Sequence, residues 1–198
     1  MFVKNQVLDP LCELGRWLKE AHEAEITDPA TCTFATVDRE GRPTARTVKM
    51  KRVADDALLF TSALWTRKVR DIKANPHVAI VFHWPELGRQ IQIVGTVTFG
   101  SRELAAELYA DRDVLHQLQT VVSRQGKPIG SEELETMRDR LAHLAEVQET
   151  PPRCPEDWGA LLVTPEAIEL WSESADRIHE RRLFTRPDGH WTLQLLSP

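Results

Sequence analysis

Hydrophobic residues recur along the chain at two different spacings, and each spacing predicts a kind of element. From about residue 9 to residue 24 the apolar positions repeat every three or four residues, which is typical of an amphipathic helix. Asp9 followed by Pro10 favours a helix start, because Asp is a good N-cap and Pro is tolerated at the first helical position. We therefore expect a packing helix here, ended by the turn residues 27–29.

Between residues 31 and 98 the pattern changes to short runs of β type that turn residues separate. Such runs are typical of a meander or barrel rather than of alternating strands and helices. A short helix is expected to interrupt them and to end before Asn75, because the next residue is Pro76. The strands expected in this part of the chain are Thr33–Asp38, Pro43–Val53, Leu58–Thr61, His77–Trp84 and Arg89–Thr98.

Helical spacing returns over about 101–147, where Ser101 can cap one helix and Ser131 begins another with a clear apolar stripe. The pattern of 110–130 fits helix and loop equally well. Strands are expected again over about 158–196, ending in a hairpin with a turn at 187–189. The sequence thus predicts one domain over residues 1–198, mainly β with flanking α-helices.

Composition narrows the class of protein. A hydrophobic content of 41% with 28% charged residues is that of a globular chain, and a net charge of -5 argues against nucleic-acid binding. No apolar run approaches the roughly 20 residues that span a bilayer, and no secretory signal is visible, so we expect a cytoplasmic protein. Cys12, Cys32 and Cys154 form no Cys-x-x-Cys pair and are interpreted as packing thiols. The histidines lack ligand spacing, so no metal is predicted.

The densest group of functional side chains lies at residues 171–182. If residues 177–182 are extended, Arg177, His179 and Arg181 share one face, because side chains alternate along a strand. This cationic face carries an imidazole and favours an anionic ligand, phosphate above all. The alternative is a solvated edge strand whose arginines pair with acidic residues elsewhere.

Further basic clusters occur at Arg46 to Lys51, at Thr66-Arg67-Lys68 and at residues 123–125. The two ends of the first would face opposite sides of an ideal strand. To serve one ligand they would need a bulge, or they would contact separate parts of that ligand. The second can bring hydroxyl, guanidinium, ammonium and backbone N–H groups to a phosphate, or it is simply a solvated helix start. No Gly-rich phosphate loop, nucleophile elbow or carboxylate pair is visible, which suggests that a phosphorylated cofactor carries the chemistry.

Taken together and in order, these clusters resemble the pyridoxamine 5′-phosphate oxidase family of flavoproteins, over about residues 9–198. The resemblance implies an FMN-binding split β-barrel that forms a homodimer, with FMN in clefts at the subunit interface. It places Arg67 and Lys68 at the flavin phosphate. The full cofactor-binding set that it implies is Arg46, Thr47, Val48, Lys51, Phe60, Thr61, Thr66, Arg67, Lys68, Gln90, Gln125, Trp171 and Arg181.

The same resemblance implies a substrate set of Lys51, Arg112, His116, Arg177 and His179. The last two would be the catalytic pair that flanks the reacting ring. The implied reaction oxidises pyridoxamine or pyridoxine 5′-phosphate to pyridoxal 5′-phosphate, with dioxygen as acceptor and hydrogen peroxide as product.

The chain departs from the vitamin B6 enzymes on the substrate side. In the family, the stretch that matches residues 108–119 supplies ligands for the substrate phosphate, and only Arg112 of these remains here. Leu108, beside Tyr109, stands where the family has Tyr, and His116 stands where it has Ser. Ser123-Arg124-Gln125 and His179-Glu180-Arg181 resemble the phenazine-biosynthesis branch, whereas Lys51 fits the B6 enzymes. One alternative is therefore an FMN oxidase of a phenazine-type or other anionic aromatic compound. The other is a non-catalytic flavin-binding protein, and the retention of Arg177 and His179 disfavours this second alternative.

Overall fold

A computed structural model describes residues 9–54 and 56–198 of the chain. The described chain forms two compact units. The first comprises the residues up to Phe60 together with Asp71–Thr98 and Leu162–Pro198, and the second comprises Thr61–Arg70 and Phe99–Leu161. The expectation of one domain over residues 1–198 stays a prediction.

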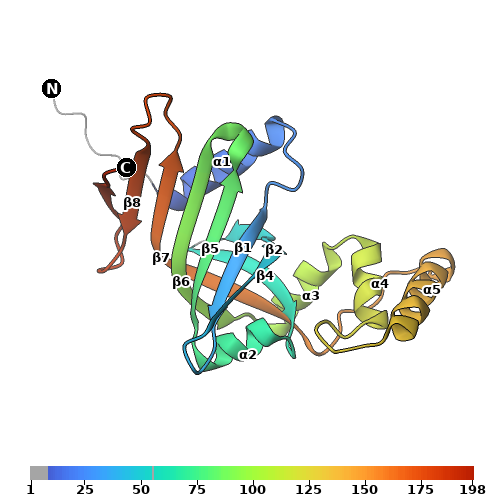
Figure 1. Ribbon diagram of the computed structural model, residues 1–198. Coiled ribbons are helices and arrows are strands. Elements are labelled where there is room, and N and C mark those ends of the chain that lie inside the picture. Colours follow the sequence, from blue (N-terminus) through green and yellow to red (C-terminus); the bar gives the residue numbers. More distant parts are fainter. Residues whose placement is uncertain (1–8, 55) are drawn as a thin grey trace. The chain divides into compact units, whose positions relative to one another are not determined.

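Helices and strands follow one another in the order that the sequence predicts (Figure 1). The helices are α1 (Pro10–Glu23), α2 (Arg67–Ala74), α3 (Arg102–Ala110), α4 (Val114–Val122) and α5 (Ser131–Val147), with a 3-10 turn at Pro85–Leu87. The strands are β1 (Thr31–Val37), β2 (Pro43–Lys49), β3 (Arg52–Ala54), β4 (Ala57–Ala63), β5 (His77–Trp84), β6 (Arg89–Phe99), β7 (Trp158–Ser172), β8 (Glu180–Thr185) and β9 (Thr192–Leu195).

The strands of the described chain form one sheet in the order β2-β1-β5-β6-β7-β4-β3, with β8 paired to β7 and β9 to β8. The pairs whose register is described are antiparallel, as in β5–β6, where Phe82 lies opposite Ile91. Strand β7 is 15 residues long, and its last residues, from Ala167 to Ser172, carry β8. The structure therefore confirms a mainly β protein with flanking helices.

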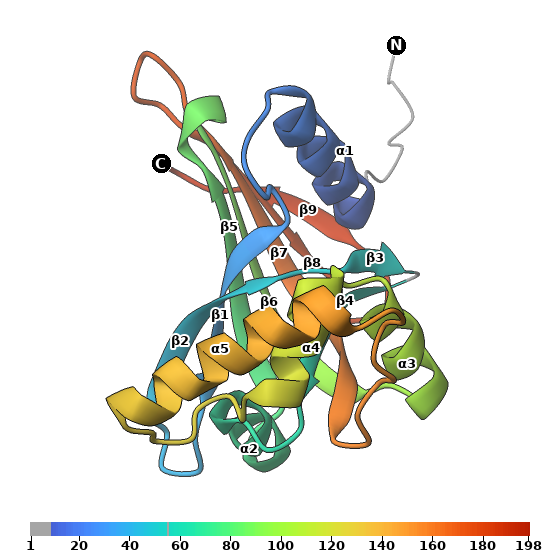
Figure 2. The same ribbon diagram turned by 90° about the vertical axis from the view of Figure 1, so that its right-hand side faces the viewer.

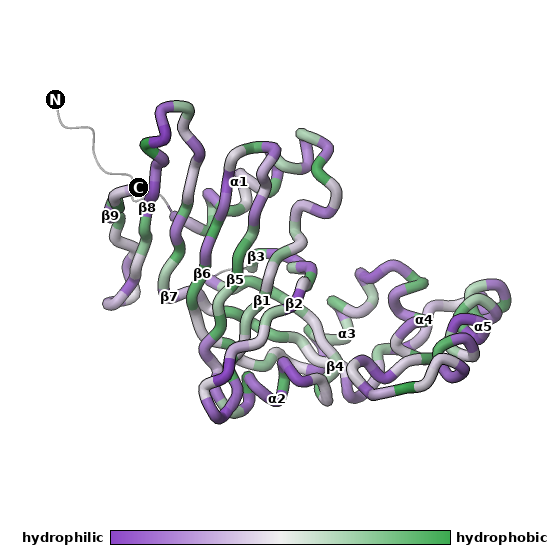
Figure 3. Tube along the Cα trace, in the orientation of Figure 1, coloured by the Kyte–Doolittle hydropathy of each residue, from purple (hydrophilic) through white to green (hydrophobic). Residues whose placement is uncertain are grey.

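The core of the first unit lies under helix α1 and along the middle strands of the sheet. Asp9 caps α1 as predicted, because its Oδ1 accepts from the Leu11 N–H at 3.0 Å. Trp17 of this helix is 1% exposed and meets Trp84 of β5 edge to face, at 6.5 Å between ring centroids. Figure 2 shows α1 beside the sheet, and in Figure 3 hydrophobic segments follow β5 and β6.

Strands β6 and β7 approach closely at Gly95. A Cβ atom built on Gly95 would lie 2.3 Å from the Thr164 carbonyl oxygen and 2.9 Å from the Pro165 Cα. Both are backbone atoms of the neighbouring strand, so no side-chain rotation could relieve the overlap. Only glycine fits this crossing.

The second unit has its own packed centre. Tyr109 of α3 and Trp158 meet edge to face at 5.7 Å between ring centroids, with Ala63 in the same buried cluster. Arg102 ties the connection before β7 to α3, since its guanidinium donates to the carbonyl oxygens of Cys154 at 2.5 Å and Pro155 at 2.7 Å. These contacts hold the proline-rich segment in place without regular secondary structure.

Several sequence-based expectations need correction. The predicted strand Pro43–Val53 is two strands, because the chain leaves the ladder at Met50 and Lys51, where the Met50 side chain is buried. Residues 114–122 of the ambiguous segment are helical. Cys12 is exposed, so the interpretation as a packing thiol is wrong for it, whereas Cys32 is buried.

Candidate functional site

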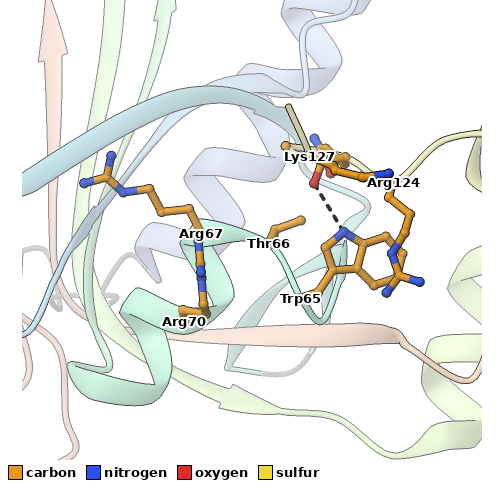
Figure 4. Close-up of a pocket in the computed structure, with 8 residues that line it drawn as sticks. Trp65, Thr66, Arg67, Arg70, Arg124 and Lys127 are labelled. Atoms are coloured by element: carbon orange, nitrogen blue, oxygen red, sulfur yellow. Dashed lines mark hydrogen bonds between the residues drawn. The ribbon is translucent and has the colours of Figure 1, made fainter. Parts of the chain in front are cut away.

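A pocket of about 320 Å³ lies in the second unit, where the start of α2 meets the loop after α4 (Figure 4). It joins two sequence segments that lie nearly sixty residues apart, and both carry predicted cofactor ligands. Four of its side chains are cationic, so the pocket favours an anion. The lining residues are Trp65, Thr66, Arg67, Arg70, Arg124, Gln125, Gly126 and Lys127.

The start of α2 is held by hydroxyl groups that face the protein. The Thr66 carbonyl oxygen accepts from the Val69 and Arg70 N–H groups, each at 3.1 Å, and begins the helix. Its Oγ1 donates to the Ala63 carbonyl oxygen at 2.9 Å and lies 3.1 Å from Ser62 Oγ. Lys68 Nζ donates to the same Ser62 oxygen at 3.1 Å. This network fixes the direction in which residues 66–68 leave the strand.

The loop after α4 is joined to this helix start by Trp65. The indole Nε1–H donates to the Gln125 carbonyl oxygen at 3.2 Å. The Arg124 guanidinium lies over the Trp65 ring, 4.5 Å from its centroid, and comes within 3.9 Å of Asp157. Figure 4 shows the stacked pair and the hydrogen bond at one side of the pocket.

Sequence reasoning assigned three of the eight lining residues to the cofactor, Thr66, Arg67 and Gln125, and named Arg124 in the basic cluster beside Gln125. Arg70 could have been found, because it follows Arg67 by three residues and therefore lies on the same helix face. Lys127 is two residues beyond Gln125 and shares its loop. Trp65 carries no sequence signal of this kind, since nothing in its neighbourhood predicts an aromatic contact with residues 124–125.

Arg112 of the second unit is packed between aromatic rings. Its guanidinium lies 4.3 Å from the Trp158 ring centroid and 5.4 Å from that of Tyr109. Burial lowers the pKa of this guanidinium from its ordinary value. Nη1 is buried and has no hydrogen-bond partner among the described residues, which suits a site for an anion brought by a ligand.

The neighbours of Arg112 differ in whether their side chains are free to contact a ligand. The Leu108 side chain is 1% exposed, and the Tyr109 hydroxyl donates to the Gln117 carbonyl oxygen at 3.0 Å and lies 2.8 Å from Thr120 Oγ1. His116 is exposed on α4. Gln117, which sequence reasoning missed, donates to the Arg112 carbonyl oxygen at 2.7 Å and orders the turn between the helices.

In the first unit, Arg46 belongs to a polar network on the sheet. Its Nη1 donates to the Phe34 carbonyl oxygen at 3.0 Å and to Thr36 Oγ1 at 2.9 Å, and its Nη2 donates to Thr44 Oγ1 at 2.7 Å. The Asp71 carboxylate completes the network, because it accepts from Thr36 at 2.7 Å. Much of the hydrogen-bonding capacity of the guanidinium is therefore used within the protein.

The other predicted residues of the sheet differ in exposure. Lys51 lies at the break between β2 and β3. The strand is therefore irregular here, as binding of one ligand by both Arg46 and Lys51 would require. Phe60 is 2% exposed and packs on Phe34, so its ring belongs to the core. The remaining four are not buried: Thr47 is exposed, and Val48, Thr61 and Gln90 are half-buried.

Three candidates come together where β7 pairs with β8. Trp171 lies opposite Arg181 in the ladder, and the Trp171 and His179 rings have centroids 5.0 Å apart. Arg181 Nε donates to Glu169 Oε1 at 2.7 Å, and this hydrogen bond raises the pKa of the guanidinium. The structure thus brings Trp171, His179 and Arg181 together.

The extended conformation expected for residues 177–182 is wrong for its first half. Strand β8 begins at Glu180, and the segment before it is a turn in which Arg177 has a φ angle of 68°. That angle belongs to the left-handed region, so Arg177 and Arg181 do not share the face of one strand. The physical reason is a pair of hydrogen bonds that the Asp176 carboxylate accepts, from Ser174 Oγ and from the Ile178 N–H, which alternation along a strand cannot reveal.

Among residues 9–54 and 56–198, no group of three or more His, Cys, Asp or Glu side chains could hold a metal ion. In the same part of the chain, no helix combines the length and apolarity that crossing a bilayer requires.

The sheet with its flanking helices matches solved structures of the FMN-binding split-barrel class, and the chain has this fold. It is similar to PhzG from Burkholderia lata 383, solved in complex with tetrahydrophenazine-1-carboxylic acid, with a TM-score of 0.89 and 24% identity over 100% of this chain and 98% of that one. It is also similar to a pyridoxamine 5′-phosphate oxidase-related, FMN binding protein from Nostoc punctiforme, with a TM-score of 0.80 and 19% identity over 98% and 100%.

The chain belongs to the pyridoxamine 5′-phosphate oxidase family. The family model described by that name matches residues 18–137, and the pyridoxine 5′-phosphate oxidase C-terminal dimerisation region matches residues 158–198. The chain is 38% identical over 191 residues to the pyridoxine/pyridoxamine 5′-phosphate oxidase of Paraburkholderia phymatum, covering 96% of this chain and 89% of the relative. The enzyme of the same name from Gluconobacter oxydans is 35% identical, with coverages of 96% and 94%.

Proposed function

We propose that the protein is an FMN-dependent oxidase that acts as a homodimer and oxidises pyridoxamine or pyridoxine 5′-phosphate to pyridoxal 5′-phosphate. Dioxygen is the acceptor and hydrogen peroxide the product. The relatives at 35 to 38% identity carry the name of this activity.

The observation that carries the proposal is the cationic pocket of the second unit. Its donors suit a phosphate ester, because Arg67 and Gln125 line the same pocket and Thr66 opens the adjoining helix. Arg67 and Lys68 would hold the flavin phosphate. When bound, FMN supplies a two-electron acceptor that dioxygen can reoxidise.

Arg112 supports an anionic substrate. A buried guanidinium nitrogen without a partner among the described residues is costly unless a ligand supplies an acceptor. The half-buried Lys51 is proposed as a second cation for the substrate, and Arg177 and His179 as the groups that orient the reacting ring.

The matched C-terminal dimerisation region supports a homodimer. This region, residues 158–198, contains Trp171, Arg177, His179 and Arg181, which are all proposed site residues. We therefore place the cofactor at the subunit interface, where dissociation of the dimer would release FMN.

An anaerobic reduction assay tests the proposal. The purified protein is titrated with FMN and then mixed, without oxygen, with pyridoxamine 5′-phosphate while flavin absorbance is followed. The proposal expects saturable FMN uptake, bleaching of the flavin, and hydrogen peroxide when air is admitted. A protein that takes up no FMN contradicts the cofactor assignment, and one that holds FMN but is not reduced contradicts the substrate.

A second candidate is an FMN oxidase of a phenazine-type or another anionic aromatic compound. Two features of the second unit favour it: the Tyr109 hydroxyl is engaged inside the helix pair, and Leu108 is buried and apolar. Neither side chain is then placed to bind a substrate phosphate. Adding aromatic carboxylates to the same anaerobic screen separates the two candidates, because only one class of compound should reduce the flavin rapidly.

A further inference from the structure

The loop between β7 and β8, residues 173–179, holds Arg177 in an unusual backbone conformation. Its φ angle of 68° lies in the left-handed region, which arginine seldom adopts because its Cβ crowds the following carbonyl group. Arg177 is exposed, so core packing does not impose this angle. The surrounding loop must therefore hold it.

Asp176 supplies that restraint. Its Oδ1 accepts from the Ile178 N–H at 2.9 Å and from Ser174 Oγ at 2.5 Å, so it bonds to both sides of the turn. The Arg177 N–H donates to the Ser174 carbonyl oxygen at 3.1 Å. The hydrogen bond from Ser174, followed by that from Ile178, lowers the pKa of the Asp176 carboxyl, which is therefore ionised at neutral pH.

The same loop sets the state of His179. The Ser174 backbone N–H donates to His179 Nδ1 at 3.1 Å. Since Nδ1 is an acceptor in this bond, the neutral imidazole carries its hydrogen on Nε2. The ring also lies against Trp171, which restricts its rotation. Ser174 thus links the two restraints, its side chain bonding to Asp176 and its backbone to His179.

We propose that Asp176 and Ser174 are positioning residues for the Arg177–His179 pair: they hold Arg177 in its left-handed conformation and keep the His179 hydrogen on Nε2. This inference rests on the proposed function of the pair at the substrate. Asp176 provides the acceptor that shapes the turn and does not itself contact the substrate. The loop then presents a guanidinium and an imidazole N–H in fixed directions before a ligand arrives.

The first test is the rate of flavin reduction in Asp176 variants of the FMN-loaded protein. D176A removes the acceptor and is expected to slow reduction by about tenfold to a hundredfold, because small misplacements of orienting groups have effects of this size. D176N retains an Oδ1 acceptor and should restore most of the rate. D188A makes the same change in the exposed β8–β9 turn and should react like the wild type. Asp176 is exposed, so D176A is expected to fold, and its thermal transition checks this.

Two outcomes overturn the inference in this assay. An unchanged rate in D176A refutes it, because loss of a residue that positions the pair must slow the reaction. A D176N variant as slow as D176A refutes it as well, because the charge and not the acceptor would then matter.

The second test reads the imidazole directly and is independent of turnover. Nitrogen NMR of the FMN-loaded protein, labelled with ¹⁵N-histidine, distinguishes a protonated from an unprotonated ring nitrogen, and loss of one signal in H179Q identifies His179. The inference expects hydrogen on Nε2 in the wild type and a mixture of both forms in D176A. Retention of the wild-type form in D176A overturns it. Should the wild-type flavin resist reduction by every B6 vitamer, the proposed substrate fails while this measurement still decides the role of Asp176.

Discussion

Arg124 offers a test of how the pocket of the second unit binds its anion. Its guanidinium lies over the Trp65 ring at 4.5 Å, and Trp65 in turn bonds to the Gln125 carbonyl oxygen. Replacing Arg124 by Met removes both the charge and the planar group while keeping a long side chain. We expect the loop of residues 124–127 to lose order and the pocket to lose one of its four cations.

The magnitude follows from these two losses. A cation–π contact at an exposed site contributes about 0.5–1 kcal/mol, and Arg124 is 64% exposed. Loss of one cation near a bound phosphate in a solvated pocket adds a similar amount, about 0.5–1 kcal/mol. The sum of about 1–2 kcal/mol predicts FMN binding weakened by about five- to thirtyfold, at 1.4 kcal/mol per factor of ten. R124K keeps the charge and loses the stack, so its affinity should fall by only about two- to fivefold.

The assay is a titration of the apoprotein with FMN, followed by quenching of flavin fluorescence at two salt concentrations. R138M is the matched control, because Arg138 is 63% exposed, belongs to the same unit and pairs with one carboxylate, but does not line the pocket. The deficit of R124M should shrink at high salt as the charge contribution is screened. R124M binding FMN within twofold of R138M would refute this account of the pocket.

Three other predictions concern stability and substrate affinity. G95A should lower the free energy of unfolding by about 1–3 kcal/mol in urea denaturation, because the added Cβ would overlap the Thr164 carbonyl oxygen. R112M should raise KM for the anionic substrate by about tenfold or more, since hydrogen bonds to charged groups contribute about 1.5–3 kcal/mol. The affinity for FMN should be retained. An unchanged KM would mean that the anion of the substrate binds elsewhere. The hydrogen bond from Arg89 lowers the pKa of Glu20 from its ordinary value of 4.5, so the carboxylate adds stability above pH 4.5 that is lost as the pH falls through the lowered pKa. Thermal melts of E20Q and wild type should therefore differ at neutral pH and converge in acid.

Local sequence was enough for the elements whose periodicity and caps agree. Asp9 and Ser101 cap the helices that follow them, and the alternation around Gln90 places Ile91 and Ile93 inward. Strand β5 has the bounds His77–Trp84 that its pattern predicts. In these places the chain's own propensity and its burial favour the same structure, so no distant contact was needed to decide it.

Local sequence failed where a distant or side-chain contact overrides the pattern. Segment 114–122 is equally compatible with helix and loop until Tyr109 bonds to the Gln117 carbonyl oxygen and Thr120 across the turn. The second strand reads as continuous, but it is interrupted at Met50 and Lys51, where the chain changes its pairing partner from β1 to β4. Neither contact can be read from a spacing of two or of 3.6 residues.

The stretch with Trp171, Arg177 and His179 shows the same division. Sequence alone determined which groups gather there and that they suit an anionic ligand, because residue types and their order are properties of the chain. A local turn set the direction of Arg177, because hydrogen bonds that Asp176 accepts from residues two positions away replace an expected strand. Only the tertiary structure brought Trp171 against His179, through the pairing of β7 with β8. The pocket of Arg67 and Gln125 likewise depends on chain folding, because it joins segments whose separation in sequence carries no information about their distance in space.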